Sequence, residues 1–204
     1  MSQEPLQAAA LISGAGRTIR SLELSIRAQR IPVRIGVVIA HDEQLPGVRA
    51  CRELGLEVTI VPGSPGAHTS DLVDRVLLEH GTRLICLGGY LRKFRVGELW
   101  KNRVLNIHPA LLPDFGGRGM YGNRVHQAVL ESGCSKTGCT VHWVDEEYDH
   151  GAHLLQKSCR VHAKDDVESL AARVFELECQ AYPEALEMID RTHLDAGLCE
   201  VDHA

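Results

Sequence analysis

The chain has 204 residues and a formal net charge of −5, with 44% hydrophobic and 24% charged residues. This length suits one domain with a full hydrophobic core, and no linker or change in composition divides it. The sequence has no lysine- and arginine-rich block and no run of about 20 apolar residues, so neither nucleic-acid binding nor membrane spanning is expected.

The cysteines and the N-terminal segment bear on the compartment. Seven cysteines, an odd number, occur without any Cys-x-x-Cys pair. Reduced thiols in a cytoplasmic protein explain this pattern most simply. The first apolar run, Ala8–Ile12, is too short for the hydrophobic part of a signal peptide, and no basic segment precedes it. We therefore expect a cytoplasmic protein.

Strands and helices are expected to alternate along the first half of the chain. Continuous apolar runs predict buried strands, and apolar residues at helical spacing predict helices. The expected strands cover residues 8–12, 33–40, 56–61, 84–87 and 104–108, and the expected helices begin near residue 17 and cover residues 48–54 and 71–80. This alternation predicts an α/β fold with a single doubly wound, mostly parallel sheet and helices on both faces.

The pattern changes after the strand that ends at residue 108. A helix is expected at 125–130, and two strand-like runs, 140–144 and 154–161, then lie close together around a polar loop. This spacing predicts an antiparallel C-terminal extension of the sheet. A long helix with apolar residues at helical spacing follows. We expect residues 1–189 to form one domain and residues 190–204 a loosely held tail.

The most informative segment is Val104–Pro113, where an apolar run ends in Asn106-x-His108 and a proline follows. Side chains two positions apart on a strand point to the same side, so the amide and the imidazole should share one face at a strand end. A second polar cluster, at 145–151, contains Asp149. An amide, an imidazole and a carboxylate brought together can bind a developing oxyanion and move a proton, which is typical of acyl transfer.

A glycine-containing turn, Ser13–Thr18, lies between the first strand and the first helix. Open backbone N–H groups and the helix dipole at such a turn can bind an anion, and glycine lets the backbone approach it. A lone Gly-x-Gly is weak evidence, so a plain strand-to-helix turn is the alternative.

The sequence resembles the folate-dependent formyltransferases through Asn106–Pro109, Leu111–Pro113 and the later Asp149–Gly151. The resemblance extends from about residue 11 to residue 182. It implies the formyltransferase fold and transfer of the formyl group of 10-formyltetrahydrofolate, a co-substrate, to an amine. Within the family the chain looks most like the members that formylate 5'-phosphoribosylglycinamide in de novo purine biosynthesis.

The resemblance also implies a mechanism. The acceptor amine would attack the formyl carbon directly and form a tetrahedral intermediate, without a covalent formyl-enzyme. Asn106 would donate a hydrogen bond to the oxygen of that intermediate. His108, as an imidazolium, would stabilise the same charge and relay a proton, and Asp149 would raise the pKa of His108.

Two sets of binding residues follow from the resemblance. The co-substrate residues would be Tyr90, Leu91, Arg92, Lys93, Phe94, Asn106, Val144, Asp145, Glu146, Glu147 and Tyr148. The acceptor residues would be Gly16, Arg17, Thr18, Gly89, Pro109 and Glu178. The family holds the 5'-phosphate with Ser-Gly-x-Gly-Ser-Asn. Here Arg17-Thr18 replaces Ser-Asn, which keeps a hydroxyl and adds a cation. For Glu178, which would face the ribose hydroxyls, a solvated helix face is the competing interpretation.

Two other segments depart from the commonest family members. The loop at 62–69 lacks an arginine that often reaches the folate tail. The segment Phe115–Asn123 is longer and glycine-rich, which suggests a mobile flap over the acceptor site. His142, His150 and His153 could suggest a metal site, but no His-Glu-x-x-His or paired cysteine spacing supports one, and no metal is expected.

Several alternative functions remain open. A formyltetrahydrofolate hydrolase would use the same three polar residues with water as the acceptor, although that family usually adds an N-terminal regulatory domain, and this chain opens with its first strand. Formyl transfer to another amino sugar or amine is a second alternative. A methionyl-tRNA formyltransferase is not expected, because it would need an RNA-binding domain and a basic surface. A folate-binding protein is not expected either, because it would not need all three polar residues. The expected partner is a small molecule, and the protein is expected to be a monomer or a homodimer.

Overall fold

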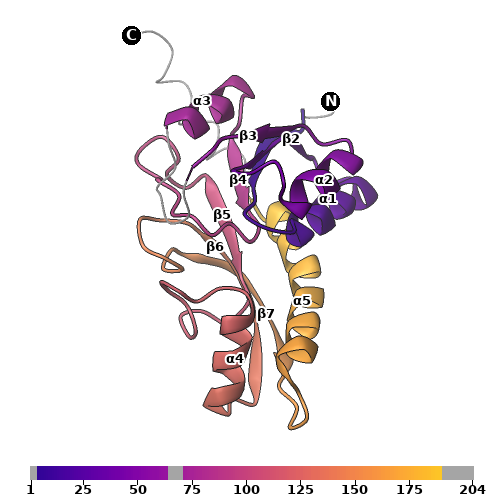
Figure 1. Ribbon diagram of the computed structural model, residues 1–204, viewed down its shortest axis with the longest axis vertical. Coiled ribbons are helices and arrows are strands. Elements are labelled where there is room, and N and C mark those ends of the chain that lie inside the picture. Colours follow the sequence, from indigo (N-terminus) through magenta and orange to yellow (C-terminus); the bar gives the residue numbers. More distant parts are fainter. Residues whose placement is uncertain (1–3, 64–70, 190–204) are drawn as a thin grey trace.

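The computed structural model describes residues 4–63 and 71–189, so the expected tail at 190–204 and most of the loop at 62–69 lie outside the described residues. A seven-stranded sheet in the order β3-β2-β1-β4-β5-β6-β7 runs through the molecule (Figure 1). Its strands are β1 (Leu6–Leu11), β2 (Val33–Ala40), β3 (Val58–Ile60), β4 (Leu84–Leu87), β5 (Val104–His108), β6 (Lys136–Trp143) and β7 (His153–Arg160).

The pairing of the strands confirms the predicted topology. Strands β1 to β5 pair in parallel, whereas β6 is antiparallel to β5 and β7 is antiparallel to β6. β6 begins four residues earlier than the apolar pattern indicated. Its first residues, Lys136–Cys139, include polar side chains and a glycine that conceal the strand, but they pair in register with β7, beginning with Lys136 opposite Arg160.

Helices cover both faces of the sheet, as predicted. They are α1 (Arg17–Gln29), α2 (Pro46–Glu53), α3 (Asp71–Glu79), α4 (Asn123–Ser132) and α5 (Val167–Glu187). One buried cluster joins the sheet to apolar side chains of α1, α2, α4 and α5. The other joins the opposite face to α3 and to the segment that contains Phe94, Val96 and Trp100. The apolar strands are therefore covered on both sides.

Alternation along β5 decides which side chains reach the site. Leu105 and Ile107 belong to the core cluster under α5. Asn106 and His108 therefore point to the opposite face of the sheet. The antiparallel register places His142 opposite Asn106 and Thr140 opposite His108. The end of β5 thus presents polar groups from two strands on one face.

Helix α5 is fixed to the same part of the sheet. Its N-terminus carries a capping box in which Asp166 accepts a hydrogen bond from the N–H of Ser169. Near its other end the buried hydroxyl of Tyr182 lies 3.0 Å from the carbonyl oxygen of Leu87 and 3.1 Å from that of Leu105. The two hydrogen bonds of Tyr182 join this end of α5 to β4 and β5.

Candidate active site

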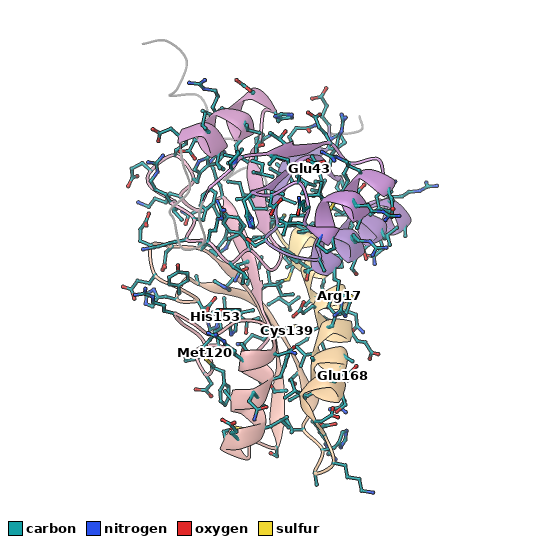
Figure 2. All side chains as sticks on the ribbon, viewed as in Figure 1. Arg17, Glu43, Met120, Cys139, His153 and Glu168 are labelled. Carbon is teal, nitrogen blue, oxygen red and sulfur yellow. The ribbon has the colours of Figure 1, made fainter. Side chains whose placement is uncertain are left out.

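A cavity of about 910 Å³ opens where several strands of the sheet end. Its lining comes from the start of α1, the segment after β4, the end of β5, the segment before α4, the loop after β6 and one side of α5. Figure 2 labels two of the lining residues, Arg17 at the start of α1 and Met120 before α4. Ligand sites in open α/β sheets lie in this position, beyond the carboxyl ends of the strands.

Four polar side chains meet at the floor of the cavity. The amide nitrogen of Asn106 lies 3.1 Å from Nε2 of His142 and 3.5 Å from Oδ1 of Asp149. Nδ1 of His108 lies 3.4 Å from Oδ2 of Asp149. The His108 and Asp149 side chains are only 4% and 11% exposed. The structure thus brings together the amide, imidazole and carboxylate predicted from the sequence, and it adds a second imidazole.

This second imidazole, His142, fixes the orientation of the Asn106 amide. Nδ1 of His142 lies 2.9 Å from the carbonyl oxygen of Trp143, which can only accept, so this nitrogen carries a hydrogen. Without a second hydrogen, Nε2 accepts from the Asn106 amide at 3.1 Å; with one, it faces Oδ1 of Asp149 at 3.7 Å. The sequence had suggested His142 only as a possible metal ligand. Its position opposite Asn106 in an antiparallel pair was the signal for this structural role.

The backbone around Asp149 explains the Asp-x-Gly motif. Asp149 has a left-handed conformation with φ 54°, which aspartate tolerates better than most residues. A Cβ atom on Gly151 would lie 1.9 Å from the carbonyl oxygen of Trp143, so only glycine fits there. The N–H of Gly117 donates to Oδ2 of Asp149 at 3.0 Å. The tight turn at Asp149–Gly151 and the hydrogen bond from Gly117, in the segment after β5, together place the carboxylate beside His108.

Burial and the Asp149 charge act on the pKa of His108 in opposite directions. Burial lowers the pKa of His108 below its ordinary value, although the Asp149 carboxylate and the Phe115 carbonyl act in the opposite direction. Nε2 of His108 donates to that carbonyl oxygen at 2.8 Å. Burial also tends to raise the pKa of Asp149, but contacts with His142, His108 and the N–H of Gly117 lower it overall. The Asp149 charge thus acts in the expected direction, but burial has the larger effect, so the neutral imidazole beside a carboxylate is favoured at rest.

The residues expected to bind the co-substrate lie around the cavity with one exception. Tyr90 to Phe94, Val144, Asp145, Glu147 and Tyr148 all line it. Glu146 does not. Its Oε1 accepts from the N–H of Gly97 at 3.0 Å, so its side chain anchors the loop instead of facing the cavity. The Arg92 guanidinium, which was expected to bind a folate carboxylate, donates one hydrogen bond to the carbonyl oxygen of Gly63. Part of its donor capacity is therefore already used.

The expected acceptor residues also gather on one side of the cavity, apart from Gly16. The residues that line it are Arg17, Thr18, Gly89, Pro109 and Glu178. Gly16 does not line the cavity; it is the N-cap residue of α1, with φ 63°. The first backbone bond of α1 runs from Arg20 N–H to the Gly16 carbonyl, so the preceding N–H groups have no partner within the helix.

Glu178 is partly buried in the cavity wall and does not stand on a fully solvated helix face. Its Oε2 lies 3.4 Å from the hydroxyl of Thr18. Burial raises the pKa of Glu178 to about 7, against smaller lowering effects of Thr18 and of the Arg17 charge. A carboxyl group held near its midpoint at neutral pH is unusual outside functional sites.

Three lining residues had no assigned role in the sequence. His126, in α4, is 5% exposed and its Nδ1 has no hydrogen-bond partner; burial and the charge of His108 lower its pKa. Phe175, on α5, lies under the guanidinium of Arg17. Arg118 belongs to the glycine-rich segment, which does border the cavity. The glycine-rich pattern marks the segment that contains Arg118, whereas no short-range pattern marks His126 and Phe175, which reach the cavity through packing of distant segments.

Two features are absent from the residues that the structure describes. Across residues 4–63 and 71–189, no group of three or more His, Cys, Asp or Glu side chains is placed to hold a metal ion, so the absence of a metal stays a prediction. No helix in the same two ranges is long and apolar enough to cross a membrane.

Comparison with known proteins identifies the family. The family model described as formyl transferase matches residues 6–186, and the chain belongs to this family. A phosphoribosylglycinamide formyltransferase of Arabidopsis thaliana, described as chloroplastic, is 38% identical over 89% of this chain and 64% of the plant protein. The trifunctional purine biosynthetic protein adenosine-3 of Gallus gallus is 36% identical over 94% of this chain, which spans only 19% of that protein.

Solved structures agree with the family and with the fold. A glycinamide ribonucleotide transformylase of Symbiobacterium toebii superposes with a TM-score of 0.82 at 34% identity, covering 92% of this chain and 88% of the bacterial one. A phosphoribosylglycinamide formyltransferase of Brucella melitensis superposes with a TM-score of 0.79 at 31% identity, covering 90% and 95%. The sheet with its antiparallel extension is therefore the formyltransferase fold.

Proposed function

We propose that this chain transfers the formyl group of 10-formyltetrahydrofolate to the amine of 5'-phosphoribosylglycinamide in de novo purine biosynthesis. The observation that carries the proposal is the cluster of Asn106, His108 and Asp149 at the floor of a cavity that the start of α1 also lines. The family and the names of its similar members support the same reaction.

The cavity suits a folate on its other side. At about 910 Å³ it lies near the upper end of the usual range for small-molecule sites. Leu91, Phe94 and Val144 offer apolar surface, and Tyr90 adds an aromatic ring. Burial raises the pKa of the Tyr90 hydroxyl to about 12. A planar heterocycle needs such walls, together with a few polar groups to orient it.

Asn106 is the donor for the oxygen of the formyl group. One N–H of its amide is held by His142, and the other faces Asp149 at a long 3.5 Å. An oxygen that gains negative charge as the amine attacks competes well for this second N–H. A preoriented donor of this kind stabilises the charge that develops in the transition state.

The His108–Asp149 pair moves the proton. As the new C–N bond forms, the formyl C=O electron pair moves to oxygen and the amine gives up a proton. His108, neutral at rest, accepts it, and Asp149 stabilises the resulting imidazolium. The pair returns the proton to the folate nitrogen as the old C–N bond breaks. No covalent enzyme intermediate is needed, because the amine is itself the nucleophile.

The acceptor side offers a phosphate site at the start of α1. The unpaired N–H groups of its first turn and the Arg17 cation favour a 5'-phosphate, and Glu178 with Thr18 offers hydrogen bonds to ribose hydroxyls. The proposal also includes a cytoplasmic monomer or homodimer that needs no metal. Free thiols at all six cysteines of the described residues are compatible with a reducing compartment.

One assay separates the proposal from its alternatives. The purified chain is mixed with 10-formyltetrahydrofolate, with and without 5'-phosphoribosylglycinamide, and release of tetrahydrofolate is followed together with formylation of the acceptor. We expect release only with the acceptor, and one formylated product per tetrahydrofolate. Release at the same rate without acceptor would identify a hydrolase instead. Release that requires a different amine would overturn the proposed acceptor.

A further inference from the structure

The acceptor side of the cavity contains a contact that the proposed function does not use. The guanidinium carbon of Arg17, at the first position of α1, lies 4.0 Å from the centre of the Phe175 ring on α5. Both residues line the cavity. They are 158 positions apart in the chain and meet because α1 packs against α5.

The stack leaves the donors of Arg17 available. Within the part of the chain that the structure describes, the Arg17 side chain forms no hydrogen bond and no ion pair, and its guanidinium stacks on the Phe175 ring. A ring covers one face of the guanidinium plane, whereas the N–H donors point outward within that plane. An arginine held in this way is fixed in orientation and still free to bind an anion.

The nearby carboxylate does not consume this cation. The charge of Arg17 lowers the pKa of Glu178, but Glu178 accepts its hydrogen bond from Thr18, and burial raises its pKa to about 7 overall. Much of Glu178 is therefore protonated at neutral pH, which limits its competition for Arg17. The positive charge remains directed to the cavity, beside the open N–H groups of the α1 first turn.

We propose that Phe175 is a positioning residue that holds the Arg17 guanidinium ready for the 5'-phosphate, and so sets the preference of this site for phosphorylated acceptors. The inference rests on the proposed function, since it assigns the acceptor phosphate to the start of α1. An arginine free in solvent loses side-chain entropy when it binds a phosphate. The stack removes part of that cost before the ligand arrives.

The test measures binding apart from turnover. Affinities for ribose 5-phosphate and for ribose are compared by calorimetry in the parent protein and in Phe175→Leu, which removes the ring but keeps an apolar side chain. Loss of a cation–π contact should weaken ribose 5-phosphate binding about 2- to 30-fold and leave ribose unchanged. Phe175→Tyr, which keeps the ring face, should restore the parent affinity.

A double-mutant cycle identifies the route of the effect. In an Arg17→Ala background, Phe175→Leu should cause no further loss, because the cation that the ring positions is gone. Glu176→Ala, an exposed neighbour on the same helix, is the matched control and should behave as the parent. Steady-state formylation should show a higher acceptor KM in Phe175→Leu with kcat within about twofold, since bound acceptor meets the same His108 and Asn106.

Three outcomes would overturn the inference: an unchanged affinity in Phe175→Leu, equal losses for ribose and its phosphate, or the same loss in the Arg17→Ala background. Failure of the proposed function is a separate result. It would appear as parent protein that binds ribose 5-phosphate through Arg17 and Phe175 yet does not formylate 5'-phosphoribosylglycinamide.

Discussion

The loop after β6 contributes an aspartate to each of two histidine–aspartate pairs, and the two pairs behave in opposite ways. On the floor of the cavity, Nδ1 of His108 lies 3.4 Å from Asp149, and the side chains are 4% and 11% exposed. On the rim, Nδ1 of His150 lies 2.8 Å from Asp145, and the side chains are 65% and 43% exposed. The pKa of His108 is lowered, mainly by burial, whereas hydrogen bonding to Asp145 raises that of His150.

This comparison shows that the residue types of a pair do not fix its protonation. The rim pair keeps its water, so a short hydrogen bond to Asp145 is enough to favour the charged imidazole, although solvent leaves such a pair little effect on stability. The floor pair has lost its water and has a longer contact, so the neutral imidazole is favoured. A neutral imidazole beside a carboxylate can accept a proton, which the proposed reaction requires.

The largest expected effect comes from removing each histidine in turn. His108→Ala should lower kcat about 10²- to 10⁴-fold, because the group that accepts the amine proton is lost. His150→Ala should keep kcat near that of the parent, since the His150 side chain does not line the cavity. Steady-state formylation measures both, and circular dichroism checks the fold. Near-normal turnover in His108→Ala would remove His108 from the mechanism.

Most of the fold, and the central residues of the site, could be predicted from the sequence. Apolar strands alternate with helices, and the period of a strand is enough to place Asn106 and His108 on one face. The role of His142 depends on the antiparallel register of β6 against β5, which places it opposite Asn106. That register is set by the folded sheet and has no local signature.

Two properties of the site required the assembled structure. The net pKa shift of His108 reflects burial by several segments, which outweighs the raising effect of Asp149 expected from the sequence. The stack of Arg17 on Phe175 joins the first helix to the last one, and neither residue belongs to a recognisable motif there. Properties that depend on desolvation and on long-range packing are those that local patterns describe least well.

An intermediate effect is expected when each aspartate is neutralised. Asp149→Asn should lower the pKa of His108 further, because it removes the charge that favours the imidazolium. Asp145→Asn should instead lower the pKa of His150 and leave His108 unchanged. NMR titration of the imidazole protons resolves the two histidines. If Asp149→Asn left the pKa of His108 where it was, the carboxylate would organise the loop through Gly117 and would not tune the imidazole.

The smallest expected effect is a pH-dependent change in stability at Glu178. This partly buried acid accepts its hydrogen bond from a hydroxyl and not from a cation. Its pKa rises from 4.5 to about 7 on folding, so the folded state favours the protonated form. The stability that this group contributes is therefore fully present below pH 4.5 and is lost as the pH rises through about 7.

Glu178→Gln imitates the protonated form at every pH and can still accept the Thr18 hydrogen bond. Its free energy of unfolding in urea, relative to that of the parent, should therefore increase between pH 4.5 and about 7 and level off above that range. Glu176→Gln, exposed on the same helix, is the matched control for the loss of a carboxylate from α5. A stability difference that stays constant over this pH range would mean that water or Arg17 solvates Glu178 enough to cancel the effect of burial. The acceptor side would then resemble the exposed rim pair and not the buried floor pair.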